Sequence, residues 1–499
     1  MSDAALLLIT VGCSLLGGII IFMLPEQQRG LRTTINLAAA LVKILCLALI
    51  IDSVLQGQVL SVRVPFLPGA DLVLRADAMS LLFATLSALL WLVTTVYAIG
   101  YLEGAPHRRR FFGFFSLCVT ATMGIALAGN LLTFFVFYEL LTLTTYPLVV
   151  HRGTTKALAA GQRYLAYTLI GGVVLLAGVV WLQLLLGSVD FAHGGVVSGL
   201  AASHGSQLVM IFMLLIGGVA VKAAVVPLHG WLPQAMVAPA PVSALLHAVA
   251  VVKAGAFGVV RICYDVFGIE LAASLGLLQP LAVVAAATIL WGSLRALVQD
   301  DLKRRLAYST ISQASYIILG VALFGPLGTI GGLVHLVHQG IMKITLFFCA
   351  GNYAETLGVH AISEMDGVGE RMPLTSLAFT IGALGMIGVP ATAGFVSKWY
   401  LGQGALAADM GWVLWLLLAS SLLNAAYFLP ILHRIWFRAQ RQPWPHELIE
   451  RRPGRETSLL LLVPPLVTAL SVVVAGLWAS APFSPLAWAR LITALEYLP

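Results

Sequence analysis

The sequence has very little charge for its length. Only 10% of its 499 residues are Asp, Glu, Lys or Arg, whereas a typical soluble domain carries about 25%. Hydrophobic residues make up 60%, and the mean hydropathy is +0.96. This composition excludes an ordinary soluble protein and indicates a polytopic membrane protein. The net charge of +7 comes mostly from arginines in the predicted loops, so it does not favour nucleic acid as a partner.

Motifs for redox chemistry and nucleotide binding are also absent from the sequence. The five cysteines are scattered through apolar segments without a CxxC or other ligand spacing, so we expect neither an iron–sulfur cluster nor a disulfide framework. No GxGxxG follows a predicted strand, and no P-loop is present. We therefore expect no bound cofactor and no metal. A dehydrogenase label, if one applied, would belong to a complex and not to this chain.

Fourteen apolar runs approach the ~20 residues that a membrane-spanning helix needs. They cover 4–24, 34–55, 79–100, 112–129, 131–150, 161–186, 207–228, 242–263, 275–295, 307–324, 326–350, 374–401, 411–433 and 457–480. The first run has no basic segment before it and no cleavage site after it, so we interpret it as a retained helix. The alternating pattern over 56–78 predicts a β-hairpin outside the membrane.

The distribution of basic residues between the loops tests the predicted spans. If both termini face outward, nineteen basic residues fall in inward loops and four fall outside, at Arg63, Arg75, Arg261 and Arg490. Positive charge is retained on the cytoplasmic side of membrane proteins. The distribution therefore predicts a multi-pass protein of the cell inner (plasma) membrane with both termini on the outer side.

The five remaining basic residues are all lysines inside apolar runs: Lys43, Lys222, Lys253, Lys343 and Lys398. A lysine at bilayer depth costs about 2.5–3.5 kcal/mol, so such residues generally serve a function. Unlike arginine, a buried lysine can give up its proton near neutral pH. Glu139 is the one acid placed well inside an apolar run, and together these residues predict a charge-coupled relay. Lys43 stands apart, and we expect it to be structural, with its ammonium group reaching toward the inner surface.

Histidines accompany this set. His335 and His338 share one broad side of a predicted helix with Lys343. A proton relay is favoured over a metal site there, because histidine titrates near neutral pH and no acid or cysteine completes a ligand set. His247 is a further possible relay residue, for which a structural role is equally compatible with the sequence.

Glycine and proline interrupt the Lys222 and Lys398 segments, and pairs of interrupted helices are typical of inverted repeats. The four predicted parts are an N-terminal three-helix segment with the hairpin (1–111), a first five-helix repeat (112–263), a second one (264–433), and a C-terminal loop with the last helix (434–499).

Four motifs, together with the apolar segment around Glu139, carry a family resemblance. They are KAAVVPLHGWLPQAMVAPAPVSALLHAVAVVKAG at 222–255, QDDLKRRLAYSTISQASYIILG at 299–320, HLVHQGIMK at 335–343 and GVPATAGFVSK at 388–398. In combination they resemble the antiporter-like subunits of the complex I superfamily. Members include the L, M and N subunits of respiratory complex I, the A and D subunits of Mrp antiporters and subunits of membrane-bound hydrogenases. The resemblance implies an all-α fold of about fourteen transmembrane helices with two inverted five-helix repeats, each with a broken helix.

The resemblance also implies a role for each charge inside the membrane. The family's paired glutamate and lysine match Glu139 and Lys222, and its central lysine matches Lys253. The family's histidines and lysine on the eleventh helix match His335, His338 and Lys343, and its lysine or glutamate on the twelfth helix matches Lys398. Protons would enter near Lys222, pass Lys253 and the histidine row, and leave through Lys398.

The function expected from this reasoning is translocation of protons, or of cations and protons, by a membrane subunit of a complex I-like, Mrp-type or hydrogenase-type complex. Its partners would be other membrane subunits, the lipid bilayer, protons and, as an open alternative, Na⁺. The short segment after the last predicted span argues against the L and Mrp A types. Two other functions stay open: an energy-coupling subunit for a soluble enzyme, such as one in inorganic-carbon uptake, and a stand-alone cation/proton antiporter.

Overall fold

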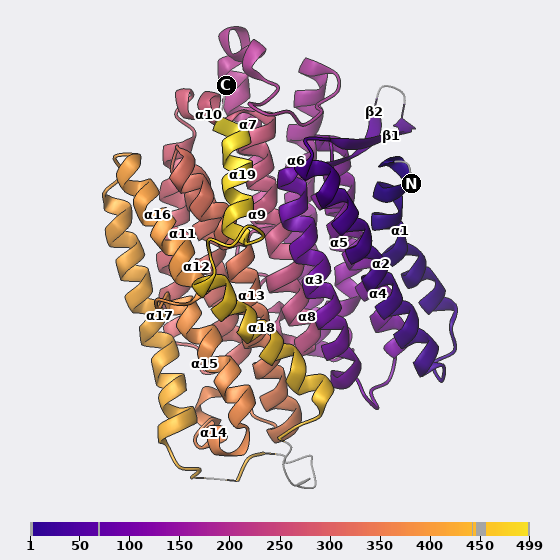
Figure 1. The fold of residues 1–499 in the computed structure, drawn as a ribbon, viewed down its shortest axis with the longest axis vertical. Helices are drawn as coiled ribbons and strands as arrows, with labels where there is room; N and C mark the ends of the chain where they lie inside the picture. The colour runs from indigo at the N-terminus through magenta and orange to yellow at the C-terminus, as the bar shows by residue number, and fades with distance from the viewer. Residues whose placement is uncertain (1–2, 68–69, 442, 446–455, 498–499) are drawn as a thin grey trace.

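The computed structural model describes residues 3–67, 70–441, 443–445 and 456–497. They form a bundle of helices with a single two-stranded sheet among the described residues (Figure 1). The first seven helices are α1 (Asp3–Met23), α2 (Arg29–Leu55), α3 (Ala78–Tyr101), α4 (Arg108–Ala126), α5 (Leu131–Val149), α6 (Thr155–Leu186) and α7 (Ala201–Lys222). The middle helices are α8 (Ala240–Ala244), α9 (Val251–Arg261), α10 (Ile269–Ser274), α11 (Leu278–Leu297), α12 (Leu302–Ala322) and α13 (Pro326–Leu357). The last six are α14 (Val368–Arg371), α15 (Pro373–Ile387), α16 (Ala393–Ala407), α17 (Trp412–Phe437), α18 (Leu459–Leu477) and α19 (Pro485–Tyr497).

The predicted spans correspond to helices throughout the described chain. Eleven helical segments there are long and apolar enough to cross a membrane. The hairpin is confirmed, with β1 (Leu60–Leu67) antiparallel to β2 (Ala70–Ala76). The predicted span 374–401 is two helices, α15 and α16, because Gly388 adopts a left-handed conformation that ends α15. The amphipathic helix α19 was not predicted.

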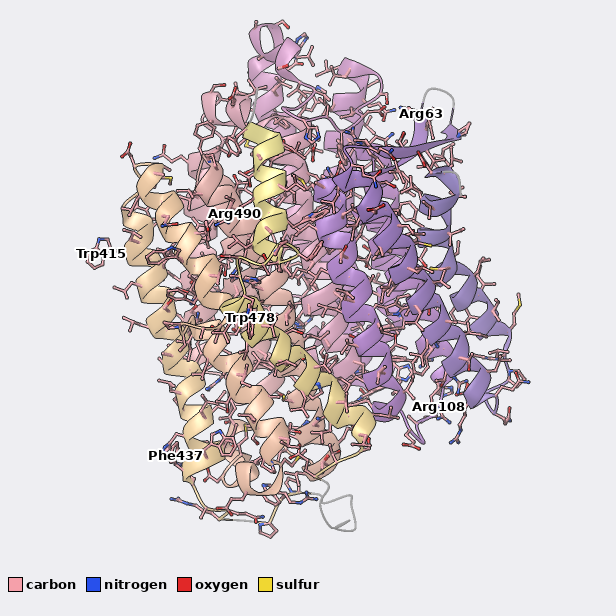
Figure 2. The ribbon with its side chains drawn as sticks, viewed as in Figure 1. Arg63, Arg108, Trp415, Phe437, Trp478 and Arg490 are labelled. Atoms are coloured by element: carbon pink, nitrogen blue, oxygen red, sulfur yellow. The ribbon has the colours of Figure 1, made fainter. Side chains whose placement is uncertain are left out.

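The bundle has two distinct ends. The hairpin end carries β1, β2 and Arg63, and the arginine end carries Arg108 (Figure 2). Helix α1 begins and α19 ends toward the hairpin end (Figure 1). Which end faces the cytoplasm stays a prediction. Three of the predicted inward arginines, at 451, 452 and 455, lie outside the described residues.

The centre of the bundle consists of two segments that lipid hardly reaches. The most apolar window of the segment Ala240–Val266 is 100% buried, and that of α13 is 94% buried. Helix α18 crosses the bundle obliquely in front of this centre (Figure 1). Lipid tails are as apolar as leucine, so helices here gain little from the hydrophobic effect and depend on close packing. A Cβ added at Gly320 of α12 would lie 2.5 Å from the Gly332 Cα of α13, which shows how closely these two backbones approach.

The central segment and α7 are interrupted at positions set by local sequence. Helix α7 ends at Lys222, not at 228 as predicted, because Ala224 has a φ of +57° and Pro227 lacks a backbone donor. Between α8 and α9 lies a π-helical turn, Leu245–Val249, followed by the non-helical residue Ala250. Such π-turns leave backbone groups out of the regular ladder and recur at functional sites.

Two basic residues are buried in the bundle. Arg261, predicted on the outward side of the membrane, ends α9 beside Asp77 and is 1% exposed. Lys43 was expected to reach toward the inner surface, but it is 0% exposed within the bundle. In both cases other helices supply hydrogen-bond partners that the local sequence does not reveal.

Candidate functional site

Glu139 on α5 and Lys222 on α7 approach each other inside the bundle. The Lys222 Nζ lies 3.7 Å from Glu139 Oε1, and the lysine side chain is fully buried. The same Nζ donates a hydrogen bond to the Tyr138 carbonyl oxygen and lies 3.3 Å from the centroid of the Tyr138 ring. The Glu139 carboxylate fits because residue 172 on α6 is a glycine. A Cβ added at Gly172 would lie 2.5 Å from Glu139 Oε1.

Lys253 is the next lysine and lies on α9, which packs against α7. A Cβ at Gly255 would fall 2.2 Å from the Ala223 nitrogen, so only glycine lets α9 approach the point where α7 ends. The fully buried Lys253 Nζ donates to the Leu336 carbonyl oxygen on α13 at 2.6 Å. This bond uses one of the three donors of an ammonium group and connects the first helices of the site to α13.

His335 extends the site from α13 toward Lys398 on α16. Its Nδ1 lies 2.8 Å from the Ser397 hydroxyl, and its ring stacks on Tyr316 with centroids 5.1 Å apart. The Lys398 Nζ lies 5.7 Å from the centroid of the same Tyr316 ring. Tyr316 therefore lies between a histidine and a lysine of the predicted row, although no pattern in the sequence indicated it.

Lys343 begins a second connection toward Lys398. Its Nζ donates to the Ser309 hydroxyl at 2.6 Å, and that hydroxyl lies 2.8 Å from the Tyr427 hydroxyl on α17. Tyr427 donates to the side-chain oxygen of Asn424. All four residues are buried.

The same connection continues to Lys398 through the end of α15. The Asn424 amide donates to the Met386 carbonyl oxygen at 3.1 Å, and Lys398 donates to that oxygen, also at 3.1 Å. Lys398 further donates to the Ile387 carbonyl at 2.7 Å and to the Ser421 hydroxyl at 2.9 Å. The carbonyls are free to accept because α15 ends at Ile387, so the break in the helix creates the site of the lysine.

Several buried polar atoms along this row have no hydrogen-bond partner among the described residues. They are Glu139 Oε1, His335 Nε2, both ring nitrogens of His247 and of His338, and the side-chain amides of Gln313 and Gln339. Buried polar groups are nearly always hydrogen-bonded, to ordered water where protein atoms do not suffice. Most of these atoms lie on or near α13 and the π-turn, so this is where ordered water would supply hydrogen bonds that protein atoms do not.

The structure thus connects most, though not all, of the predicted residues. Glu139 and Lys222 form one pair, while Lys253, His335, Lys343 and Lys398 are joined through α13 and its neighbours. His247 makes no such connection: its ring packs on Phe347 with centroids 4.6 Å apart. His338 lies on α13 without a hydrogen-bond partner for its ring among the described residues.

A buried charge cluster at the hairpin end was missed by the sequence reasoning. Arg261 donates to both Asp77 carboxylate oxygens at 3.1 and 3.0 Å, to Asp265 at 2.9 Å and to the Ser80 hydroxyl at 2.6 Å. The spacing of Arg261 and Asp265, four residues apart on one helix, was a signal for part of it. The pairing of Arg261 with Asp77, the residue before α3, could not be predicted from the sequence.

His193 in the α6–α7 connection closes this cluster on the outside. Its Nδ1 lies 2.9 Å from Glu496 of α19, and this hydrogen bond raises the pKa of His193 above its usual value. His193, Asp265 and Glu496 have ligand atoms within 4.8 Å of one another, and in the described chain no other group of three such donors is close enough to share a metal ion.

The fold and the buried row of ionisable side chains define an antiporter-like polytopic membrane protein. Comparison with known sequences agrees: the profile of the family NADH:quinone oxidoreductase/Mrp antiporter, transmembrane, matches residues 128–424. The chain belongs to this family.

Two relatives illustrate its range. The chain is 37% identical over 420 residues to an NADH-quinone oxidoreductase subunit N from Desulforudis audaxviator (strain MP104C), and the alignment covers 82% of each. It is 32% identical over 385 residues to the A/B component of a probable K⁺/H⁺ antiporter from Rhizobium meliloti (strain 1021), covering 77% of this chain but only 38% of the relative.

Solved structures share the whole fold. A chain of the Mrp complex from Dietzia sp. DQ12-45-1b superposes with a TM-score of 0.86 at 26% identity, covering 100% of this chain and 98% of the other. A chain of the membrane-bound sulfane sulfur reductase, an archaeal respiratory membrane complex, gives 0.85 at 25% identity, covering 99% and 97%.

Proposed function

We propose that this chain is a proton- or cation-translocating membrane subunit of a multisubunit complex. The observation that carries the proposal is the fully buried Lys222, 3.7 Å from Glu139, joined across the bundle to further buried lysines. Charged groups at this depth are expensive and are retained for ion pathways. Support for a complex comes from the similar chains in the Mrp and sulfane sulfur reductase complexes.

Glu139 and Lys222 act as the switch in this mechanism. At 3.7 Å and an effective dielectric constant of 20, their Coulomb attraction is roughly 4 kcal/mol, which favours the ammonium form. When the carboxylate moves away, that stabilisation disappears and desolvation drives the proton off the lysine. The proton then passes to Lys253 on the neighbouring helix α9.

From Lys253 the proton passes to α13 and leaves at Lys398. The Leu336 carbonyl holds Lys253 beside His335, and His335 reaches Ser397, the neighbour of Lys398. Lys343 supplies the parallel connection through Ser309 and Tyr427. His338 and His247 contribute titratable nitrogens that need water to join the row.

Protons are favoured over Na⁺ as the translocated ion, because the row consists mainly of nitrogen bases, whereas hard cations prefer oxygen ligands. The two five-helix repeats proposed for residues 112–263 and 264–433 would each contain one part of the pathway. The membrane proposed is the cell inner (plasma) membrane.

Reconstituted vesicles test this function. The tagged chain is purified in mild detergent with the proteins that accompany it, and pH changes inside the vesicles are followed with a dye. Glu139→Gln and Lys222→Ala are expected to abolish translocation while the complex still assembles. Glu103→Gln, at an exposed acid, is the matched control and should translocate normally. Wild-type rates in either of the first two variants would show that the switch is wrongly assigned.

The same preparation separates the alternative functions. Translocation by the chain without any partner would favour a stand-alone antiporter. A single large soluble enzyme among the accompanying proteins would favour an energy-coupling subunit. Dependence of the rate on Na⁺ would replace the proton-only mechanism by cation/proton exchange.

A further inference from the structure

Lys43 on α2 is a buried lysine that the mechanism above does not use. It is 0% exposed and lies eleven residues after Arg32, about 16 Å along the helix. Among the described residues no carboxylate oxygen lies within 4.0 Å of its Nζ, since the ion pairs found there do not include it. The N-terminal helices therefore hold a titratable group without a fixed counter-charge.

The surroundings of Lys43 suit both of its protonation states. Its Nζ donates to the Thr10 carbonyl oxygen at 2.7 Å and to the Ser14 hydroxyl at 2.8 Å. These two acceptors satisfy the two N–H groups of a neutral amine. The Trp91 ring on α3, with its centroid 5.3 Å from Nζ, faces the charge of an ammonium group.

A track of buried polar side chains leads from this site toward the arginine end. The Ser14 hydroxyl lies 2.9 Å from that of Thr120 on α4, and Thr120 donates to the Ser116 carbonyl at 3.0 Å. Ser116 donates to the Asn36 side chain at 3.0 Å, and Asn36 donates to the Arg32 carbonyl at 2.9 Å. All five are 2% exposed or less.

The hydrogen bonds between Lys43 and Thr120 can share one direction. Thr120 places its hydrogen on the Ser116 carbonyl, and Ser14 accepts from the lysine, so the Ser14 hydroxyl donates either to Thr120 or to the Val11 carbonyl oxygen, 3.2 Å away; in the first arrangement the bonds all point away from the lysine. In that arrangement a proton leaving Nζ can move onto Ser14 and then Thr120 without reorienting a hydroxyl first. Beyond Thr120 the track runs through the Ser116 carbonyl, the Asn36 amide and the Arg32 carbonyl, so it needs water between Thr120 and Arg32.

Few other groups face Lys43 from the helices packed around it. Cys13 of α1 and Cys46 of α2 are nearby thiols, Trp91 is the contact from α3, and Thr120 of α4 contacts Ser14, the hydrogen-bond partner of the lysine. No described acid or histidine makes a contact there, so proton exchange at this site depends on the lysine and on the track.

We propose that Lys43 is a proton-binding site, separate from the Glu139–Lys398 row, that exchanges its proton with the arginine end along Ser14, Thr120, Ser116 and Asn36. The proposal does not depend on the function proposed above, because proton binding at Lys43 is measurable in a protein that translocates nothing.

Nitrogen-15 labelling of lysine tests the proposal directly. The chain has seven lysines, so its lysine spectrum in lipid bilayers is small enough to assign. The Lys43 signal is the one lost in Lys43→Met, or in Lys43→Arg if the methionine variant does not fold. Between about pH 6 and pH 9, both the ammonium and the amine forms should appear. A single form over the whole range would overturn the proposal.

The rate at which Nζ protons exchange with D₂O tests the track. Thr120→Val should slow exchange at Lys43 at least tenfold. Thr94→Val is the matched control, because Thr94 is an equally buried threonine whose hydroxyl bonds the Leu90 carbonyl of its own helix. Equal exchange rates in the Thr120→Val variant and the wild type would show that protons do not use this track.

Discussion

Tyr427 gives the sharpest test of the connection between Lys343 and Lys398. Its hydroxyl accepts from Ser309, 2.8 Å away, and donates to Asn424. In Tyr427→Phe the ring stays, but one buried acceptor and one buried donor lose their partner. Leaving a buried polar group unsatisfied costs about 1–3 kcal/mol, so the free energy of unfolding should fall by roughly that amount.

The effect on ion translocation should be larger than this stability loss explains. If protons pass through the hydroxyl, its removal leaves a gap between Ser309 and Asn424. We expect the translocation rate to fall at least tenfold, which corresponds to about 1.4 kcal/mol in the barrier. The rate is measured in vesicles containing the chain and its accompanying proteins, with an imposed pH gradient, and thermal unfolding is followed on the same preparation.

Tyr353→Phe is the control for Tyr427→Phe. The Tyr353 hydroxyl is fully buried and lies 3.1 Å from Ser376, and among the described residues no hydrogen bond joins it to the lysines of the site. Its removal should lower stability similarly and leave translocation unchanged. If both variants translocate at the wild-type rate, protons reach Lys398 through the His335–Ser397 contact and not through Tyr427.

Two further changes test the switch and the hairpin end. In Gly172→Ala the new methyl group would lie 2.5–2.9 Å from the Glu139 carboxyl atoms, so the carboxylate must move. Translocation should therefore slow severalfold with little loss of melting temperature. Gly12→Ala is the control: nothing lies within 4 Å of the new methyl group, so neither the translocation rate nor the melting temperature should change. Glu496 raises the pKa of His193 in the folded state. The stabilisation from this pair is therefore complete below the pKa of His193 in the unfolded chain, near 6.5, and is lost as the pH rises through the pKa of His193 in the folded protein. Melting curves should therefore show Glu496→Gln destabilising the protein more at about pH 5.5 than at about pH 8.5, and an equal loss at both would contradict a protonated His193.

The sequence by itself determined the class of protein, the positions of the spans and the hairpin. Run length and the cost of charge in lipid are properties of short segments, so they need no knowledge of neighbouring helices. The same cost singled out Glu139 and the buried lysines as candidates. Helical spacing, which is also local, placed His335 and His338 on one side of a helix with Lys343.

Only the tertiary structure decided which of these residues meet. The contacts of Lys343 with Ser309, and of Ser309 with Tyr427, join α12, α13 and α17, whose relative rotation no local pattern encodes. For the same reason the burial of Arg261 could not be predicted, because its partner Asp77 lies at the start of α3, far from it in the sequence. The sequence predicted that the Lys43 ammonium group reaches toward the inner surface, whereas Thr10 and Ser14 of α1 and Trp91 of α3 surround it inside the bundle. Burial and pairing depend on how helices far apart in the sequence pack, and that is set by the whole bundle.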